Sequence, residues 1–114
     1  MKKDDFLYLA DIQEALKRIM EYSSCSMEDF LASTMIQDAI IRNFEIMGEA
    51  SKRLSNEFRE AHPEIPWSLL ARTRDRFIHH YAGVRMDILW STIQNDLPLL
   101  QKQIGKIMKE RHHS

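Results

Sequence analysis

One stretch of the sequence, from Trp67 to Tyr81, combines residue types that can carry out chemistry. Its apolar residues recur at helical spacing and predict one buried stripe: Trp67, Leu70, Ala71, Phe77, Ile78 and Tyr81. Arg74 falls in the middle of that stripe. Because an unpaired buried guanidinium is costly, Arg74 requires an anion or a water-filled cleft. Such a break in an otherwise consistent pattern tends to mark a functional site.

The polar residues around Arg74 are those that bind phosphate and transfer protons. Asp75 and His79 are four residues apart, so the carboxylate could fix the imidazole tautomer and favour its protonated form. Arg72 and Arg76 lie on the same side and on the adjacent exposed face, and three arginines and two histidines within nine residues indicate a phosphate site. Arg74 and His79 are five residues apart, so one helix does not project them in one direction. A long arginine side chain, a frayed helix end or a second subunit would have to bring them together.

A purely structural interpretation explains the same residues. Arg74 could be a core arginine paired with Glu45 or Glu49 of a neighbouring helix. Asp75 and His79 could form a surface ion pair, which is worth roughly a few tenths of a kcal/mol. The residues taken alone favour this structural interpretation over a phosphate or RNA site.

The rest of the chain predicts helices joined by short connections. The expected helices cover Asp4–Tyr22, Met27–Leu54, Pro66–Tyr81 and Met86–Glu110, with one short helical turn within 56–65. No stretch alternates with the period of a strand. The sequence therefore predicts an all-α fold, an antiparallel bundle of four or five helices in a single domain over residues 1–114.

Local signals refine these helix boundaries. Ser26 is a predicted N-cap, and the stretch after it is predicted to break near Ser33, with Thr34 capping a second helix. Met35 belongs to the predicted apolar face of that stretch. Pro98 is expected to bend the last helix, because proline removes one helical hydrogen bond and clashes with the preceding turn.

Composition limits the classes of function. The 114 residues are 44% hydrophobic and 29% charged with a net charge of −1, which excludes a strongly cationic nucleic-acid binder but not a local basic patch. No apolar stretch approaches the ~20 residues of a membrane span, and no secretory leader is evident. Cys25 is a single cysteine and no cluster of metal ligands is seen, so we expect a cytoplasmic protein without metal or cofactor. His112 and His113 are expected to belong to a terminal tail.

Four blocks of the sequence together resemble the HEPN superfamily, in the form carried by HepT-like toxins. The segment 74–81 (RDRFIHHY) is similar to the Arg-polar-x3-His-x-Tyr signature, with Asp75 where the family usually has asparagine. The segment 42–50 (RNFEIMGEA) resembles the Arg-Asn-x-Glu-x-x-Gly-Glu-Ala run of that family. Residues 65–67 resemble its Ile-Pro-Trp lead, and 87–90 with 95–98 resemble its last helix. The spacing from Arg74 and the His-x-Tyr pattern select His79 rather than His80 as the motif histidine.

The resemblance implies a homodimer in which two copies of the motif face one cleft, acting as a metal-independent ribonuclease toxin. In that chemistry the RNA 2′-OH attacks the neighbouring phosphate, and tRNA and mRNA are the candidate substrates. His79 would move the proton and Arg74 would stabilise charge on the phosphoryl oxygens. Asp75 would orient His79, while Arg72 and Arg76 would hold flanking phosphates.

The resemblance also implies a partner and a means of control. HepT-like toxins are paired with a minimal nucleotidyltransferase (MNT) antitoxin, which modifies the tyrosine of the His-x-Tyr pattern with AMP. In this chain that tyrosine is Tyr81. The added phosphate would occupy the phosphate site beside Arg74 and His79.

Two other functions remain open on the sequence. HEPN-type domains also occur as non-catalytic modules that bind nucleotide or dock onto a nucleotidyltransferase. In that case Arg74 and His79 would bind phosphate or form the dimer contact without cleaving RNA. The remaining possibility is a helical dimer with no role in nucleic-acid binding.

Overall fold

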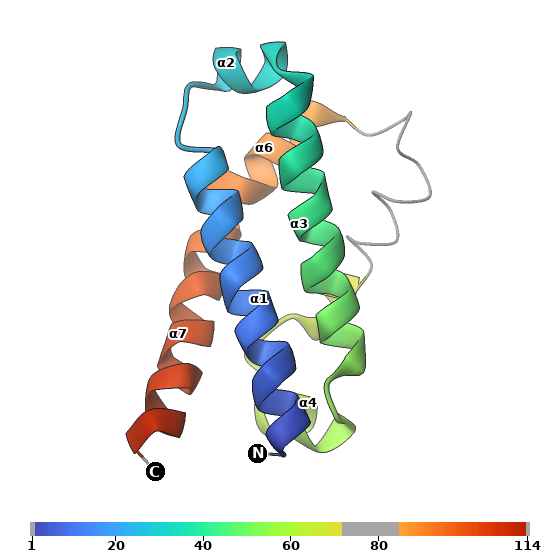
Figure 1. Cartoon of the computed structure of the whole chain (residues 1–114), viewed down its shortest axis with the longest axis vertical. Helices are drawn as coiled ribbons and strands as arrows, with labels where there is room; N and C mark the ends of the chain where they lie inside the picture. The colour runs from blue at the N-terminus through green and yellow to red at the C-terminus, as the bar shows by residue number, and fades with distance from the viewer. Residues whose placement is uncertain (1, 72–84, 114) are drawn as a thin grey trace.

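Two long antiparallel helices form the centre of the fold. In the computed structural model, which describes residues 2–71 and 85–113 (side chains to 110), they are α1 (Lys3–Tyr22) and α3 (Thr34–Arg53). They lie side by side along most of their length (Figure 1). The apolar residues of α1 recur at helical spacing, and four of them are completely buried: Leu9, Ile12, Leu16 and Ile19. Burying each such side chain contributes roughly 1.5–3 kcal/mol.

The connection between α1 and α3 contains a short helix, α2 (Met27–Ala32), at the upper end of the pair (Figure 1). Ser26 caps α2, because its hydroxyl accepts a hydrogen bond from the Asp29 N–H at 3.0 Å, so that prediction is confirmed. The cap of α3 is Ser33 and not Thr34, since the Ser33 hydroxyl accepts from the Ile36 N–H at 3.1 Å. Two neighbouring hydroxyl residues offered the same capping chemistry, and only the extended backbone of Ser33 distinguishes them.

The prediction that Met35 lies on the apolar face of the stretch 27–54 was wrong. It is the most exposed of the large apolar side chains in the described part of the chain, and Ile36, the next residue, packs against the core instead. The break at Ser33 restarts the helix, so the apolar stripe of α3 does not continue the phase of α2.

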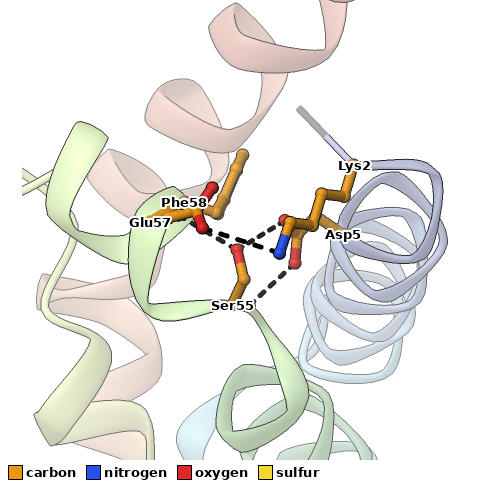
Figure 2. Close-up of polar contacts among 5 residues, drawn as sticks. All are labelled: Lys2, Asp5, Ser55, Glu57 and Phe58. Atoms are coloured by element: carbon orange, nitrogen blue, oxygen red, sulfur yellow. Dashed lines mark hydrogen bonds and ion pairs between the residues drawn. The ribbon is translucent and has the colours of Figure 1, made fainter.

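The lower end of the central pair depends on a buried carboxylate. Asp5 of α1 is only 3% exposed and accepts two hydrogen bonds from Ser55, from the backbone N–H at 2.8 Å and from the hydroxyl at 2.6 Å (Figure 2). Ser55 in turn caps α4 (Asn56–Ala61) by accepting from the Phe58 N–H at 3.1 Å. One carboxylate therefore joins the start of α1 to the turn between α3 and α4. The short helical turn predicted within 56–65 is α4.

These contacts also determine the charge of Asp5. Burial alone would raise the pKa of the Asp5 carboxyl, but the hydrogen bonds from Ser55 and the nearby charge of Lys2 outweigh it. The pKa of Asp5 consequently lies below the usual value of 3.8. The carboxylate is thus ionised at neutral pH although it is buried.

The last predicted helix is divided into α6 (Met86–Asn95) and α7 (Leu97–His113). The break is at Asp96, so the expectation of one helix bent at Pro98 was wrong. Pro98 instead occupies the second position of α7, where the missing N–H has no helical partner to lose. Helix α6 crosses behind the upper end of the central pair, where the rings of Trp90 and Phe30 are 5.1 Å apart, and α7 descends beside α1 (Figure 1).

The prediction of an all-helical fold is confirmed, since residues 2–71 and 85–113 contain no strand. Those residues form six helices and the helical turn 67–71. The predicted break near Ser33 separates α2 from α3, whereas the break between α6 and α7 was not predicted. None of these helices is long and apolar enough to cross a membrane.

Replacing Asp5 tests the lower junction. Asp5→Asn should reduce the free energy of unfolding by about 1.5–3 kcal/mol at neutral pH, because a buried charge-assisted pair of hydrogen bonds is weakened. A carboxyl whose pKa is lowered by folding stabilises the fold above its unfolded pKa, and that stabilisation is lost as the pH falls through the folded pKa. The difference between wild type and variant should therefore be constant above about pH 5 and shrink below about pH 4. Urea titrations monitored by circular dichroism measure it.

Asp11→Asn is the matched control, because Asp11 is an exposed aspartate on the same helix. It should change the free energy of unfolding by less than about 0.5 kcal/mol at either pH. An Asp5→Asn variant with wild-type stability, or a difference that does not depend on pH, would contradict the role assigned to the buried carboxylate.

Candidate functional site

The six predicted site residues all lie outside the residues that the structure describes. They are Arg72, Arg74, Asp75, Arg76, His79 and Tyr81, within the segment 72–84. His80 lies in the same segment, and the side chains of His112 and His113 are also outside. The structure does describe the residues from which the chain enters and leaves the motif segment, and the helices predicted to supply its partners.

The chain enters the motif segment from a well-packed helical turn. The predicted helix start at Pro66 is confirmed, because the Leu70 N–H donates to the Pro66 carbonyl at 3.1 Å and 67–71 are helical. The Trp67 indole N–H donates to the His62 carbonyl at 3.0 Å, and its ring lies 5.8 Å from that of Phe58 in α4. Trp67 and Leu70 are both buried. This turn is therefore fixed to α4, at the lower end of the bundle (Figure 1).

The chain leaves the motif segment at the start of α6, near the upper end of the bundle (Figure 1). Arg85 precedes α6, and its guanidinium donates to the Asp87 carboxylate at 2.8 Å. This hydrogen bond lowers the pKa of Asp87. Helix α6 is held in place by the completely buried side chains of Leu89 and Ile93 and by the Trp90–Phe30 contact near α2. The described residues before the motif segment are thus attached to α4, and those after it are attached to α2.

The helices α1 and α3 share a charged surface groove of about 280 Å³. Its lining residues are Tyr8, Asp11, Arg42, Glu45, Ile46, Glu49, Ala50 and Arg53. Glu45 and Glu49, the partners considered for Arg74, each have a local arginine: Arg42 lies 3.9 Å from Glu45 and Arg53 lies 3.7 Å from Glu49. Exposed pairs of this kind contribute little to stability.

The charge of this groove does not suit an RNA backbone. Three carboxylates (Asp11, Glu45 and Glu49) face two guanidinium groups among its lining residues. Binding of a nucleic-acid backbone is dominated by lysine and arginine side chains that neutralise phosphates, so the lining of this groove disfavours that role. Within residues 2–71 and 85–110, no group of three or more histidine, cysteine, aspartate or glutamate side chains is placed to hold a metal ion.

Asn43 is a buried polar residue that the sequence analysis did not select as a site residue. It is 5% exposed in α3, and its amide group donates to the Ala39 carbonyl at 2.9 Å. Its Oδ1 is the one buried side-chain polar atom in the described part of the chain without a hydrogen-bond partner. A buried acceptor left unpaired costs about 1–3 kcal/mol, so packing does not explain an asparagine here. The signal in the sequence is its position within the apolar stripe of Ile40, Phe44 and Met47.

Replacing Trp67 tests how firmly the motif segment is held at its start. Trp67→Phe keeps an aromatic ring against Phe58 but removes the N–H that donates to the His62 carbonyl. We expect a loss of about 0.5–1.5 kcal/mol in the free energy of unfolding, and faster hydrogen exchange of the Leu70 amide. Trp90→Phe is the matched control, because Trp90 is half-buried against Phe30 and should not change exchange at Leu70. Unchanged Leu70 exchange in Trp67→Phe would contradict this attachment.

Comparison with known proteins places the chain among relatives that match it from end to end. A protein of Thermococcus cleftensis, "Probable ribonuclease HepT", is 46% identical over 110 residues, covering 96% of this chain and all of the relative. "Putative RNase MJ0127" of Methanocaldococcus jannaschii is 38% identical over 110 residues, which are 96% of this chain and 91% of that protein. "Putative RNase TTE0752" of Caldanaerobacter subterraneus is 40% identical over 99 residues, covering 87% of this chain and 88% of that protein.

No solved structure is significantly similar to the chain. The sequence profile of one family, "Ribonuclease HepT-like", matches residues 12–107. That range includes the helices α2, α3 and α4, the motif segment and α6. The resemblance found in the four sequence blocks is thereby confirmed, and the chain belongs to the HepT-like ribonuclease family.

Proposed function

We propose that the chain is a ribonuclease that acts as a toxin and cleaves RNA without a metal ion. The observation that carries the proposal is the family match over residues 12–107, which contain Arg74 and His79 at the motif spacing. The names of the three relatives, "Probable ribonuclease HepT", "Putative RNase MJ0127" and "Putative RNase TTE0752", support the same activity. Cellular RNA in the cytoplasm, such as tRNA or mRNA, is the proposed substrate class.

The proposed reaction is an internal transesterification of RNA. The 2′ oxygen forms a bond to phosphorus while the bond from phosphorus to the 5′ oxygen breaks, which leaves a cyclic phosphate and a free 5′-OH. One proton leaves the 2′-OH and one reaches the 5′ oxygen. An imidazole such as that of His79 suits both transfers, because its ordinary pKa is near neutral pH.

The remaining motif residues act on charge and orientation. Arg74 stabilises the negative charge that builds up on the phosphoryl oxygens, as a guanidinium can do through two hydrogen bonds. Asp75 orients His79 or positions the 2′-OH. Arg72 and Arg76 hold neighbouring phosphates, which makes binding dependent on salt concentration.

We propose that the active form is a homodimer with both motif segments at one cleft. A subunit contributes one motif histidine, whereas the reaction benefits from one base and one acid. A two-fold axis supplies the second histidine without a second motif. It also removes the difficulty that Arg74 and His79, five residues apart, do not project from one helix in the same direction.

Two substitutions test the activity. Arg74→Ala and His79→Ala should each abolish RNA cleavage and growth arrest when the chain is produced without a partner, because charge stabilisation or proton transfer is lost. Growth curves and gel analysis of total RNA measure both effects, and circular dichroism checks that the variants fold. His113→Ala is the control and should behave as wild type.

The ribonuclease proposal would be wrong if an unmodified wild-type chain left both growth and RNA intact. The second candidate would then be a non-catalytic module that binds nucleotide or a nucleotidyltransferase through Arg74 and His79. In that case His79→Ala would alter binding alone.

We further propose that a nucleotidyltransferase antitoxin silences the enzyme by attaching AMP to Tyr81. The tyrosine oxygen forms a bond to the α-phosphorus of ATP, and pyrophosphate leaves. The attached phosphate brings negative charge to the site that Arg74 and His79 would otherwise offer to RNA.

Tyr81→Phe should separate this control from the activity. The variant should cleave RNA as the wild type does. It should also remain toxic when an MNT-type nucleotidyltransferase encoded beside it is co-produced, because the oxygen that accepts AMP is absent. Mass spectrometry should show one added AMP on the wild-type chain and none on the variant. Tyr22→Phe is the control, since Tyr22 is an exposed tyrosine outside the motif segment. Equal silencing of Tyr81→Phe and wild type would refute the proposed modification.

A further inference from the structure

A second surface groove lies beside the helical turn 67–71 and differs in its lining residues from the α1–α3 groove. It encloses about 240 Å³ where the turn 67–71 meets the junction of α6 and α7. Its lining residues are Glu64, Pro66, Leu69, Asn95, Asp96, Leu99, Leu100 and Gln103. A hydrogen bond of 3.2 Å from the Gln103 side chain to the Glu64 carbonyl joins its two walls.

Two leucines in this groove are exposed to an extent that packing within the chain does not explain. Leu99 is 61% exposed and Leu69 is 42% exposed, although both line the same hollow, above the buried Leu100. Leaving such side chains in water forgoes much of the roughly 1.5–3 kcal/mol that burial of a leucine contributes. Neighbouring exposed apolar groups with a polar rim are typical of a protein-binding surface.

The break between α6 and α7 creates this groove. Helix α6 ends with Asn95 and α7 restarts at Leu97, and Asp96 between them and Leu99 in the first turn of α7 both line the hollow. On the opposite wall, Pro66 and Leu69 belong to the segment that Trp67 fixes to α4. Both walls are therefore parts of the packed fold, and a partner would meet a preformed surface.

The size and the charge of the groove indicate what could fill it. Its volume is below the roughly 300–1,000 Å³ that is usual for small-molecule sites, so it suits a few large side chains rather than a whole ligand. Its lining residues include two acids, Glu64 and Asp96, and no lysine or arginine. Lys102 and Lys106 of α7 are not among the lining residues. A partner surface complementary to this groove is therefore apolar and carries positive charge beside its apolar side chains.

The cluster of exposed apolar side chains at α2, taken from a second copy of this chain, fits the groove poorly. Another set of exposed apolar side chains in the described part of the chain is at α2 and the start of α3, and comprises Met27, Leu31 and Met35. Glu28 and Asp29 lie among them in the sequence and would bring negative charge to the acidic rim. A different protein with basic residues is therefore the better occupant.

We propose that this groove docks a partner protein through an amphipathic helix that presents leucine-sized side chains flanked by lysine or arginine. The helix places its apolar residues against Leu69 and Leu99 and its positive charges near Glu64 and Asp96. This inference does not depend on the proposed ribonuclease activity, since none of the groove residues belongs to the motif.

The test uses the full chain and two synthetic helical peptides with identical leucine faces, one flanked by lysines and the other by glutamates. In a two-dimensional amide NMR titration, the lysine peptide should bind saturably and shift the amides of Leu69, Asp96, Leu99 and Gln103. The glutamate peptide should bind at least about fivefold more weakly. The double variant Glu64→Gln/Asp96→Asn should remove that preference.

Leu99→Gln should weaken binding of the lysine peptide roughly tenfold, which corresponds to the loss of part of one leucine contact. Leu7→Gln is the matched control, because Leu7 is 51% exposed on α1 and does not line the groove. Three results would overturn the proposal: shifts that map elsewhere, equal binding of both peptides, or undiminished binding by Leu99→Gln. Self-association that Leu99→Gln abolishes in sedimentation velocity would instead identify a second copy as the occupant.

Discussion

The register between α1 and α3 is the constraint on which the other elements depend. The two helices bury their stripes against each other, and α2, α4 and α7 pack around that pair. Asp5 and Ser55 fix the register, because they are 50 residues apart in sequence and join through two hydrogen bonds. A slip of one residue turns a helix face by about 100°. After such a slip, the Asp5 carboxylate would be buried without the hydrogen bonds from Ser55, which costs free energy. Apolar side chains cannot penalise a slip in register so selectively.

That junction reaches the motif segment through a short series of contacts. Ser55 caps α4, Phe58 of α4 lies against Trp67, and Trp67 begins the helical turn that leads to residue 72. The position at which the chain enters the motif is therefore tied to the first turn of α1. The position at which it leaves is set independently by α6, through Leu89, Ile93 and Trp90.

The helices with a regular apolar repeat were predictable from the sequence, and those bounded by tertiary contacts were not. Leu9, Ile12, Leu16 and Ile19 recur at helical spacing, and the structure buries all four. Asp5 gives no such signal, because its burial depends on a serine that is distant in sequence. The break at Asp96 was also missed, since Pro98 is compatible both with a bend inside one helix and with the second position of a new helix.

For the candidate site, the residues that could carry out chemistry were predicted from the sequence, and the structure describes the elements around them. Glu45 and Glu49 were considered as partners of Arg74, yet Arg42 and Arg53 lie three and four residues from them on the same helix. That helical spacing was readable from the sequence, whereas the bond from the Trp67 indole to a backbone carbonyl was not. A carbonyl acceptor has no sequence signature, so such attachments are found only in three dimensions.

The distribution of charge limits how RNA could be held in the proposed ribonuclease. The chain has a net charge of −1, the α1–α3 groove is lined by more acids than bases, and the two charged residues that line the groove beside α7 are both acidic. General attraction of a polyanion by the described surface is therefore weak. The arginines at 72, 74 and 76 would have to supply most of the phosphate contacts. In the proposed homodimer, a two-fold axis would double that small set at one cleft, so the symmetry that would provide a second histidine would also provide the positive charge that a single subunit lacks.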